Sequence, residues 1–139
     1  MRDLRPSVGL SQLLEAAGVG PHSAIRVTGS GALSALLWLH RRGYVDVGCL
    51  HAGHRAHGEE VDALLAAHTA TGNWLNDLLD RGPHVRQGGV IIVQTPSADG
   101  ALIAAHAFHQ HGFEVVRRMP GSHRDVLIAR RTLELLQAA

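Results

Sequence analysis

The sequence of 139 residues contains no lysine, so all of its 13 basic residues are arginine. Without lysine the chain has neither the basic residue of a phosphate-binding P-loop nor an amine for Schiff-base chemistry. Aromatic residues make up only 4% of the chain, too few for a platform on which single-stranded nucleic acid stacks. The formal net charge is +1, so no broad electrostatic field attracts nucleic acid or an anionic membrane. We therefore expect neither a nucleic acid nor a membrane as a partner.

Cysteine is also scarce, because Cys49 is the single one in the sequence. One cysteine excludes an intramolecular disulfide and fits a reducing compartment. Residues 1–10 contain no apolar segment of the signal-peptide kind, and no apolar run approaches membrane-spanning length. Hydrophobic residues make up 45% of the chain, enough for a real core. We expect a cytoplasmic protein that forms one compact domain over residues 1–139.

The stretch from residue 24 to residue 39 organises the rest of the chain. It predicts a strand over 23–28, a turn at Gly29-Ser30-Gly31, and a helix that ends near Arg42. In that helix Leu33, Leu36, Leu37 and His40 recur at helical spacing. A second strand over 44–50 would complete a βαβ unit, whose crossover is right-handed in nearly all proteins.

The remaining helices and strands are predicted from the spacing of apolar residues and from the residues that end helices and strands. A helix over 7–17 has Leu10, Leu13, Leu14 and Ala17 on one face, so it should cover one side of the sheet. Residues 61–67 are predicted as a strand, although alanine and leucine also favour a helix. Four consecutive β-branched residues at 90–93 predict a central parallel strand over 90–95. Two more helices are expected, near 74–81 and 98–111. Strands are expected at 113–118 and 125–129, and these two strands should be antiparallel because their connection is short. Residues 132–139 are expected to form a short helix or a tail.

Three motifs in this order resemble class I S-adenosylmethionine-dependent methyltransferases. Residues 27–32, Val-Thr-Gly-Ser-Gly-Ala, are similar to the glycine-rich motif after the first strand. Residues 85–92 contain the Gly88-Gly89 pair before a strand, and residues 112–131 resemble the closing Gly-Phe strand and hairpin. The resemblance implies a three-layer αβα sandwich around a mostly parallel, Rossmann-like sheet of about six strands with a C-terminal antiparallel hairpin.

The sequence departs from that family at several positions. Arg26 and Val27 stand where an acidic residue usually precedes the glycines, and Leu50 or His51 stands where an acid usually holds the ribose. Ala32 and Leu33 replace the third glycine. Residues 51–60 leave room for a loop but hardly for the family's third strand and its helix. The acid-Pro-Pro-aromatic motif is absent after Ala66.

The resemblance implies a site for S-adenosylmethionine or a related nucleoside at Thr28, Gly29, Ser30, Gly31 and His51. His51 and His68 are candidate general bases, because imidazole exchanges protons near neutral pH. The departures favour an alternative: a non-catalytic subunit or interaction module that kept the fold and lost the cofactor. Such a module would have a protein partner or form a homo-oligomer.

Eleven histidines suggest a further alternative. His51, His54 and His57 lie three residues apart in one predicted loop beside Cys49, where imidazoles could bind zinc. This spacing is not a standard zinc signature, and solvated loop histidines explain it as well. Ser30 lacks the glycine two positions before it that a hydrolase nucleophile elbow needs, so the turn does not predict a hydrolase.

Overall fold

The computed structural model describes residues 7–50, 60–69, 72–96, 99–119 and 124–132. These residues form four helices and six strands. In order they are α1 Ser7–Ala16, β1 Ile25–Thr28, α2 Ala32–Arg41, β2 Val47–Cys49, β3 Glu60–Thr69, α3 Gly72–Arg81, β4 His84–Pro96, α4 Asp99–Gln110, β5 Phe113–Met119 and β6 Arg124–Arg131.

The six strands form one sheet in the order β2-β1-β3-β4-β6-β5. The pairs β1–β2, β1–β3 and β3–β4 are parallel, whereas β6 runs antiparallel to both β4 and β5. Five strands therefore point the same way and only β6 is reversed. This arrangement confirms the predicted mostly parallel sheet and its closing hairpin, and it confirms that residues 61–67 belong to a strand.

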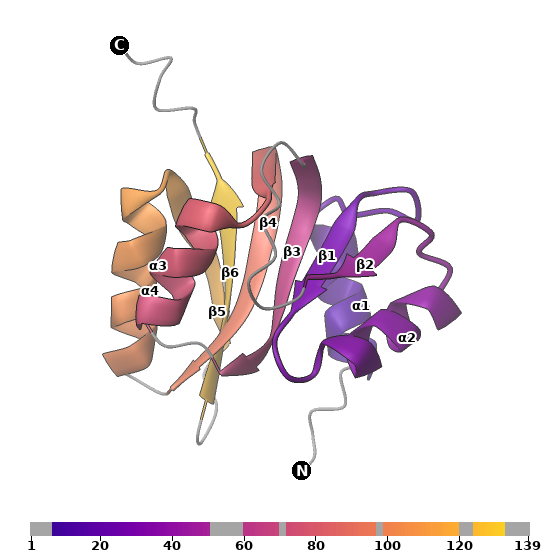
Figure 1. Ribbon diagram of the computed structural model, residues 1–139, viewed down its shortest axis with the longest axis horizontal. Helices are drawn as coiled ribbons and strands as arrows, with labels where there is room; N and C mark the ends of the chain where they lie inside the picture. Colours follow the sequence, from indigo (N-terminus) through magenta and orange to yellow (C-terminus); the bar gives the residue numbers. More distant parts are fainter. Residues whose placement is uncertain (1–6, 51–59, 70–71, 97–98, 120–123, 133–139) are drawn as a thin grey trace.

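Helices cover both faces of the sheet (Figure 1). The helices α1 and α2 bury Leu14 and Leu39 against one face, together with Ile25 and Ile92 of the strands. The helices α3 and α4 bury Leu75 and Phe108 against the other face. The result is the predicted three-layer αβα sandwich. No helix in the described part of the chain is long and apolar enough to cross a membrane.

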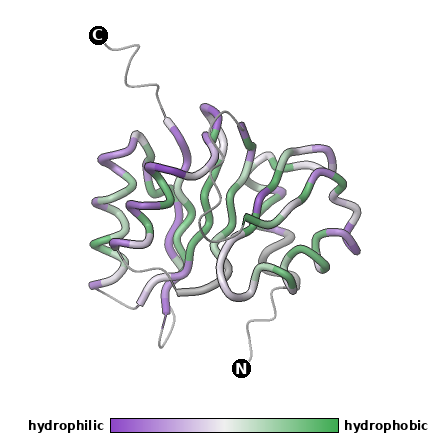
Figure 2. Tube along the Cα trace, viewed as in Figure 1, coloured by the Kyte–Doolittle hydropathy of each residue, from purple (hydrophilic) through white to green (hydrophobic). Residues whose placement is uncertain are grey.

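The strand β4 lies in the middle of the sheet, as the β-branched run predicts. Val90, Ile91 and Val93 are fully buried, and Figure 2 shows hydrophobic residues along the central strands. The prediction was wrong about where this strand begins, because β4 starts at His84 rather than at Val90.

An irregularity in the pairing of β3 with β4 explains the earlier start. Val61 pairs with Val85, but Ala63 already pairs with Val90, so β4 has extra residues at this point. The extra residues include Gly89, where an added Cβ would lie 2.8 Å from the carbonyl oxygen of Asp62. A side chain there would collide with backbone, so glycine allows the close approach.

The predicted strand over 44–50 is shorter in the structure, and the reason lies in its hydrogen bonds. The backbone N–H of Tyr44 bonds to the carbonyl of Leu39, and that of Val45 bonds to the carbonyl of Pro21. These donors are used outside the sheet, so β2 contains only Val47–Cys49. The first strand likewise begins two residues late, because the Ser23 N–H closes a turn onto Gly20.

The face of α2 that the leucine spacing suggests does not point into the core. Leu33 is 65% exposed and Leu37 is 47% exposed, whereas Ala32 and Leu39 are buried. Ala35 also packs against the buried cluster. Small alanine side chains let this helix approach the sheet closely, so the larger leucines point outward.

Candidate functional site

The turn between β1 and α2 has the geometry that the glycine pattern predicts. β1 ends at Thr28, and Gly29 follows with a φ of 103°. This left-handed conformation is strained for any residue with a side chain. The carbonyl of Gly29 accepts the N–H of Ala32 at 3.1 Å, which closes the turn. The chain then enters α2 directly after Gly31.

The helix α2 begins without a capping hydrogen bond from the side chain of its N-cap residue. Gly31 is the N-cap and offers no side-chain hydrogen bond, and the first helical turn holds no acidic residue. The exposed N–H groups of a helix start carry partial positive charge and attract anionic or polar groups. Thr28 is half-buried and Ser30 is exposed, so both hydroxyls lie near this helix start.

Strand ends from two neighbours meet at the same edge. Val27 pairs with Cys49 of β2, and Thr28 pairs with Ala66 of β3. The N–H of Leu50 donates to the carbonyl of Val27 at 2.8 Å, so the chain leaving β2 stays beside the end of β1. The sheet order reverses direction at this point. Open α/β sheets bind their ligands at such a position, outside the carboxyl ends of the strands.

Four of the predicted site residues, Thr28, Gly29, Ser30 and Gly31, form the end of β1 and the turn into α2. His51, His54 and His57 lie outside the described residues. His68 belongs to β3, two residues beyond the partner of Thr28, and only its backbone is described. No group of three or more possible metal ligands occurs among the described residues, which leaves the zinc prediction for residues 51–57 untested.

Arg26 occupies the place near which the family usually has an acid, but its charge points away from the turn. Its Nη1 donates to the carbonyls of Ile25 at 2.8 Å and Asp46 at 3.1 Å. The same nitrogen lies 3.2 Å from Oδ1 of Asp46, just before β2. The side chain crosses over Gly48, where an added Cβ would be 3.5 Å from its Cδ. Arg26 therefore ties β1 to the start of β2.

Sequence reasoning missed a buried polar pair at the carboxyl end of β4. Thr95 of β4 lies opposite Asp125 of β6, and both residues are at most 1% exposed. Asp125 Oδ2 accepts a hydrogen bond of 2.9 Å from Nε of Arg118, and Nη2 of the same guanidinium lies 2.9 Å from that oxygen as an ion pair. Thr95 Oγ1 has no hydrogen-bond partner in the described part of the chain. The signal in the sequence is weak: Asp125 shares the alternation of the buried Leu127, and Thr95 merely ends an apolar run.

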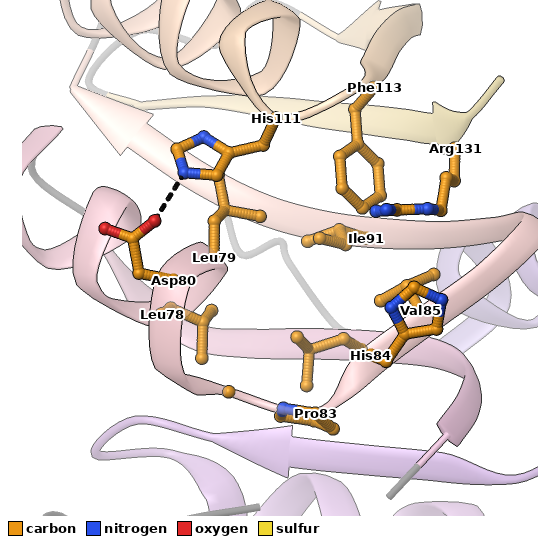
Figure 3. A pocket seen from close by; sticks show the side chains of 12 residues that line it. Leu78, Leu79, Asp80, Pro83, His84, Val85, Ile91, His111, Phe113 and Arg131 are labelled. Carbon is orange, nitrogen blue, oxygen red and sulfur yellow. Dashed lines mark hydrogen bonds and ion pairs between the residues drawn. The ribbon is translucent and has the colours of Figure 1, made fainter. Parts of the chain in front are cut away.

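Two cavities in the described structure lie away from the turn. One, of about 270 Å³, lies between the end of α3 and the strands β4, β5 and β6 (Figure 3). The other, of about 460 Å³, is an open hollow between the end of α1 and Tyr44. Neither is lined by a residue of the turn. The candidate site therefore rests on backbone geometry and strand order.

No protein-family model matches the sequence, and no curated protein matches it. Solved structures do match in three dimensions. Ribosomal protein L11 methylase from Lactobacillus delbrueckii subsp. bulgaricus superposes with a TM-score of 0.68, covering 94% of this chain and 81% of its own, at 16% identity. Precorrin-6y C5,15-methyltransferase from Geobacter metallireducens superposes with a TM-score of 0.57 at 9% identity. The match covers 96% of this chain and 93% of that protein. Aeropyrum pernix fibrillarin, solved with natively bound S-adenosyl-L-methionine, superposes with a TM-score of 0.53 at 14% identity. The match covers 80% of this chain and 57% of that protein.

These similarities define the class of fold. The chain has the Rossmann-like fold of class I S-adenosylmethionine-dependent methyltransferases, in a form whose described sheet has β2 at its edge. A fold hosts many functions, so the activity has to be argued from the site.

Proposed function

We propose that this methyltransferase-like domain binds S-adenosylmethionine or a related nucleoside at the turn between β1 and α2. The observation that carries the proposal is the left-handed Gly29, which leads straight into a helix start without a capping side chain. This turn lies where β2 and β3 flank β1. The bound S-adenosyl-L-methionine of the structurally similar Aeropyrum fibrillarin supports this choice of ligand.

The residues present fit one end of such a ligand better than the other. Backbone amides at the start of α2, with the hydroxyls of Thr28 and Ser30, suit a carboxylate or another polar group. The ribose end lacks the usual acid, because β2 ends with Cys49 and Leu50 follows. His51 is the next residue, and we propose it as the polar group on that side.

S-adenosylmethionine, when bound, supplies an electrophilic methyl group. The contribution of this chain would be to hold the methyl donor and its acceptor close together and correctly oriented. His68 follows the β3 residue that pairs with Thr28, so its backbone belongs to the same edge of the sheet. We propose His68 or His51 as the base that takes the proton of the acceptor.

Isothermal titration calorimetry with S-adenosylmethionine and S-adenosylhomocysteine tests the binding step. Gly29→Ala should weaken binding at least tenfold, because the added Cβ strains the turn. Gly43→Ala is the matched control, since Gly43 has a φ of 94° at the other end of α2 with nothing within 4 Å of an added Cβ. Both variants should lose stability, by about 1 kcal/mol, but only the first should lose affinity. Absence of binding to the folded wild-type protein at millimolar nucleoside would refute the proposal.

One observation favours a second candidate, a non-catalytic module that kept the fold. Arg26 is used to tie β1 to Asp46, and Leu50, the residue directly after β2, is not an acid that could hold a ribose. This candidate predicts a folded protein that binds neither S-adenosylmethionine nor S-adenosylhomocysteine. It also predicts a stable complex with a second copy of the chain or with another protein. Light scattering measures the self-association directly. A monomer that binds S-adenosylmethionine would exclude it.

A further inference from the structure

Two leucines on the outer side of α2 are used neither by the core nor by the nucleoside turn. Leu33 and Leu37 lie four residues apart, so they share one side of the helix. Leu33 is 65% exposed and Leu37 is 47% exposed, although Ala32 and Leu39 of the same helix are buried. Single exposed leucines are common on protein surfaces, but a pair at this spacing forms a ridge against which another helix packs.

The helix cannot turn these leucines inward, because its other side is held against the sheet. Leu39 is fully buried, and Ala35 packs against the same buried cluster. Figure 1 shows α2 on the side of the sheet away from α3 and α4, next to the edge strand β2. The exposed ridge is therefore fixed in place before a partner arrives, which lowers the entropic cost of binding.

The ridge continues into a basic end. Arg41 follows Leu37 by four residues, and His40 lies in the same last turn of α2. Figure 2 shows α2 as largely hydrophobic with a hydrophilic C-terminal end. Arg41 forms no ion pair within the described part of the chain. The helix contains no acidic residue, and the next acid along the chain, Asp46, is paired with Arg26 at 3.2 Å.

We propose that this face of α2, formed by Leu33, Leu37 and Arg41, docks an amphipathic helix of a protein partner. The partner helix would have apolar side chains along one side and acidic residues at the end that lies over Arg41. The ten residues of α2 extend about 15 Å, so about three turns of the partner would be in contact. No residue of the turn at 29–31 takes part, so the proposal holds whether or not the turn binds a nucleoside.

The same observations disfavour three other occupants of this face. A second copy of α2 would bring no acidic residue to Arg41. A strand added to the sheet edge would find only the three residues of β2 to pair with. A membrane surface would need a wider apolar face than the ridge of Leu33 and Leu37.

Fluorescence anisotropy with a labelled synthetic peptide tests the proposal. The peptide is a helix of leucine and alanine with glutamates in its first turn, and the control peptide has lysines in place of the glutamates. The full chain should bind the glutamate peptide at least tenfold more tightly, and added NaCl should weaken this binding. Equal binding of both peptides, or no saturable binding, would overturn the proposal.

Two pairs of variants separate the ridge from the charge. Leu37→Asp should abolish binding of the glutamate peptide, whereas Leu102→Asp, at a position on α4 that is 72% exposed, should leave it unchanged. Arg41→Gln should remove the preference for the glutamate peptide, whereas Arg117→Gln, on the exposed part of β5, should keep it. Undiminished binding by a folded Leu37→Asp protein would overturn the proposal, even if Arg41→Gln does not fold.

Two further measurements distinguish the other occupants. Light scattering of the wild type should give a monomer in the absence of the peptide, and a dimer that Leu37→Asp dissociates would assign this face to a second copy. Vesicles of phosphatidylserine should not bind the wild type. Vesicle binding that Leu37→Asp removes would assign the face to a membrane, and either result would overturn the proposal.

Discussion

Asp62 of β3 and Ala24, just before β1, are joined by a hydrogen bond of 2.7 Å from the Ala24 N–H to Oδ2. The other carboxylate oxygen of Asp62 accepts a hydrogen bond from Nε of Arg86 in β4. One carboxylate therefore connects three parts of the chain at the amino edge of the sheet. It also explains why β4 bulges here, because Arg86 reaches Asp62 from the extra residues.

This contact predicts a pH dependence of stability. Burial raises the pKa of Asp62, whereas the hydrogen bond from the Ala24 N–H and the charge of the Arg86 guanidinium lower it. The lowering effects together exceed the raising one, so the pKa lies below its ordinary 3.8. A lowered folded-state pKa means that Asp62 stabilises the fold fully above the ordinary value. This stabilisation is lost as the pH falls through that value and then through the folded-state pKa.

Asp62→Asn should lower the free energy of unfolding by about 1–3 kcal/mol at pH 7. It should also flatten the fall in stability below about pH 4. Urea unfolding at several pH values measures both effects. Asp77→Asn is the control, because Asp77 is exposed and pairs only with Arg81 in the described structure. An equal pH profile in the wild type and Asp62→Asn would contradict this account.

Thr95→Val should stabilise the protein. The hydroxyl of Thr95 is buried without a hydrogen-bond partner among the described residues, so an equally shaped methyl group removes a desolvation penalty. We expect a gain of about 1 kcal/mol in chemical denaturation. Thr28→Val at the half-buried end of β1 should change stability much less. A clear loss of stability in Thr95→Val would show that its hydroxyl is bonded.

The two faces of α2 should respond differently to truncation. Leu39 is fully buried, so Leu39→Ala should lower the free energy of unfolding by about 2–5 kcal/mol. Leu37 is 47% exposed, so Leu37→Ala should cost no more than about 0.5 kcal/mol. Thermal unfolding of both variants checks the orientation of the helix. Equal losses would mean that the leucine face of α2 is covered in solution.

Local patterns were enough to predict the layers and much of the sheet. The β-branched run at 90–93 indicated a buried central strand, and the glycines after Thr28 indicated the turn. The breaker residues after β3 identified a strand despite its alanines and leucines. Each of these signals lies within a few residues, where propensity and dihedral preference act.

Features that depend on distant partners were not predictable. The orientation of α2 depends on how closely Ala32 and Ala35 pack on the sheet, which periodicity does not reveal. The early start of β4 depends on contacts with Asp62, in a neighbouring strand. The pairing of Thr95 with Asp125 needs the register between β4 and β6. Candidate-site residues at 51–57 were predicted from sequence but lie outside the described residues, so they remain predictions.

Backbone-amide NMR during titration with S-adenosylhomocysteine tests the central claim most directly, because it shows which edge of the sheet receives the nucleoside. The account predicts saturable shifts at Gly29, Gly31 and Ala32, with smaller ones at Leu50 and Ala66. His111 and Phe113 at the opposite edge should not move. Saturable shifts confined to the opposite edge, or none at millimolar ligand, would contradict it.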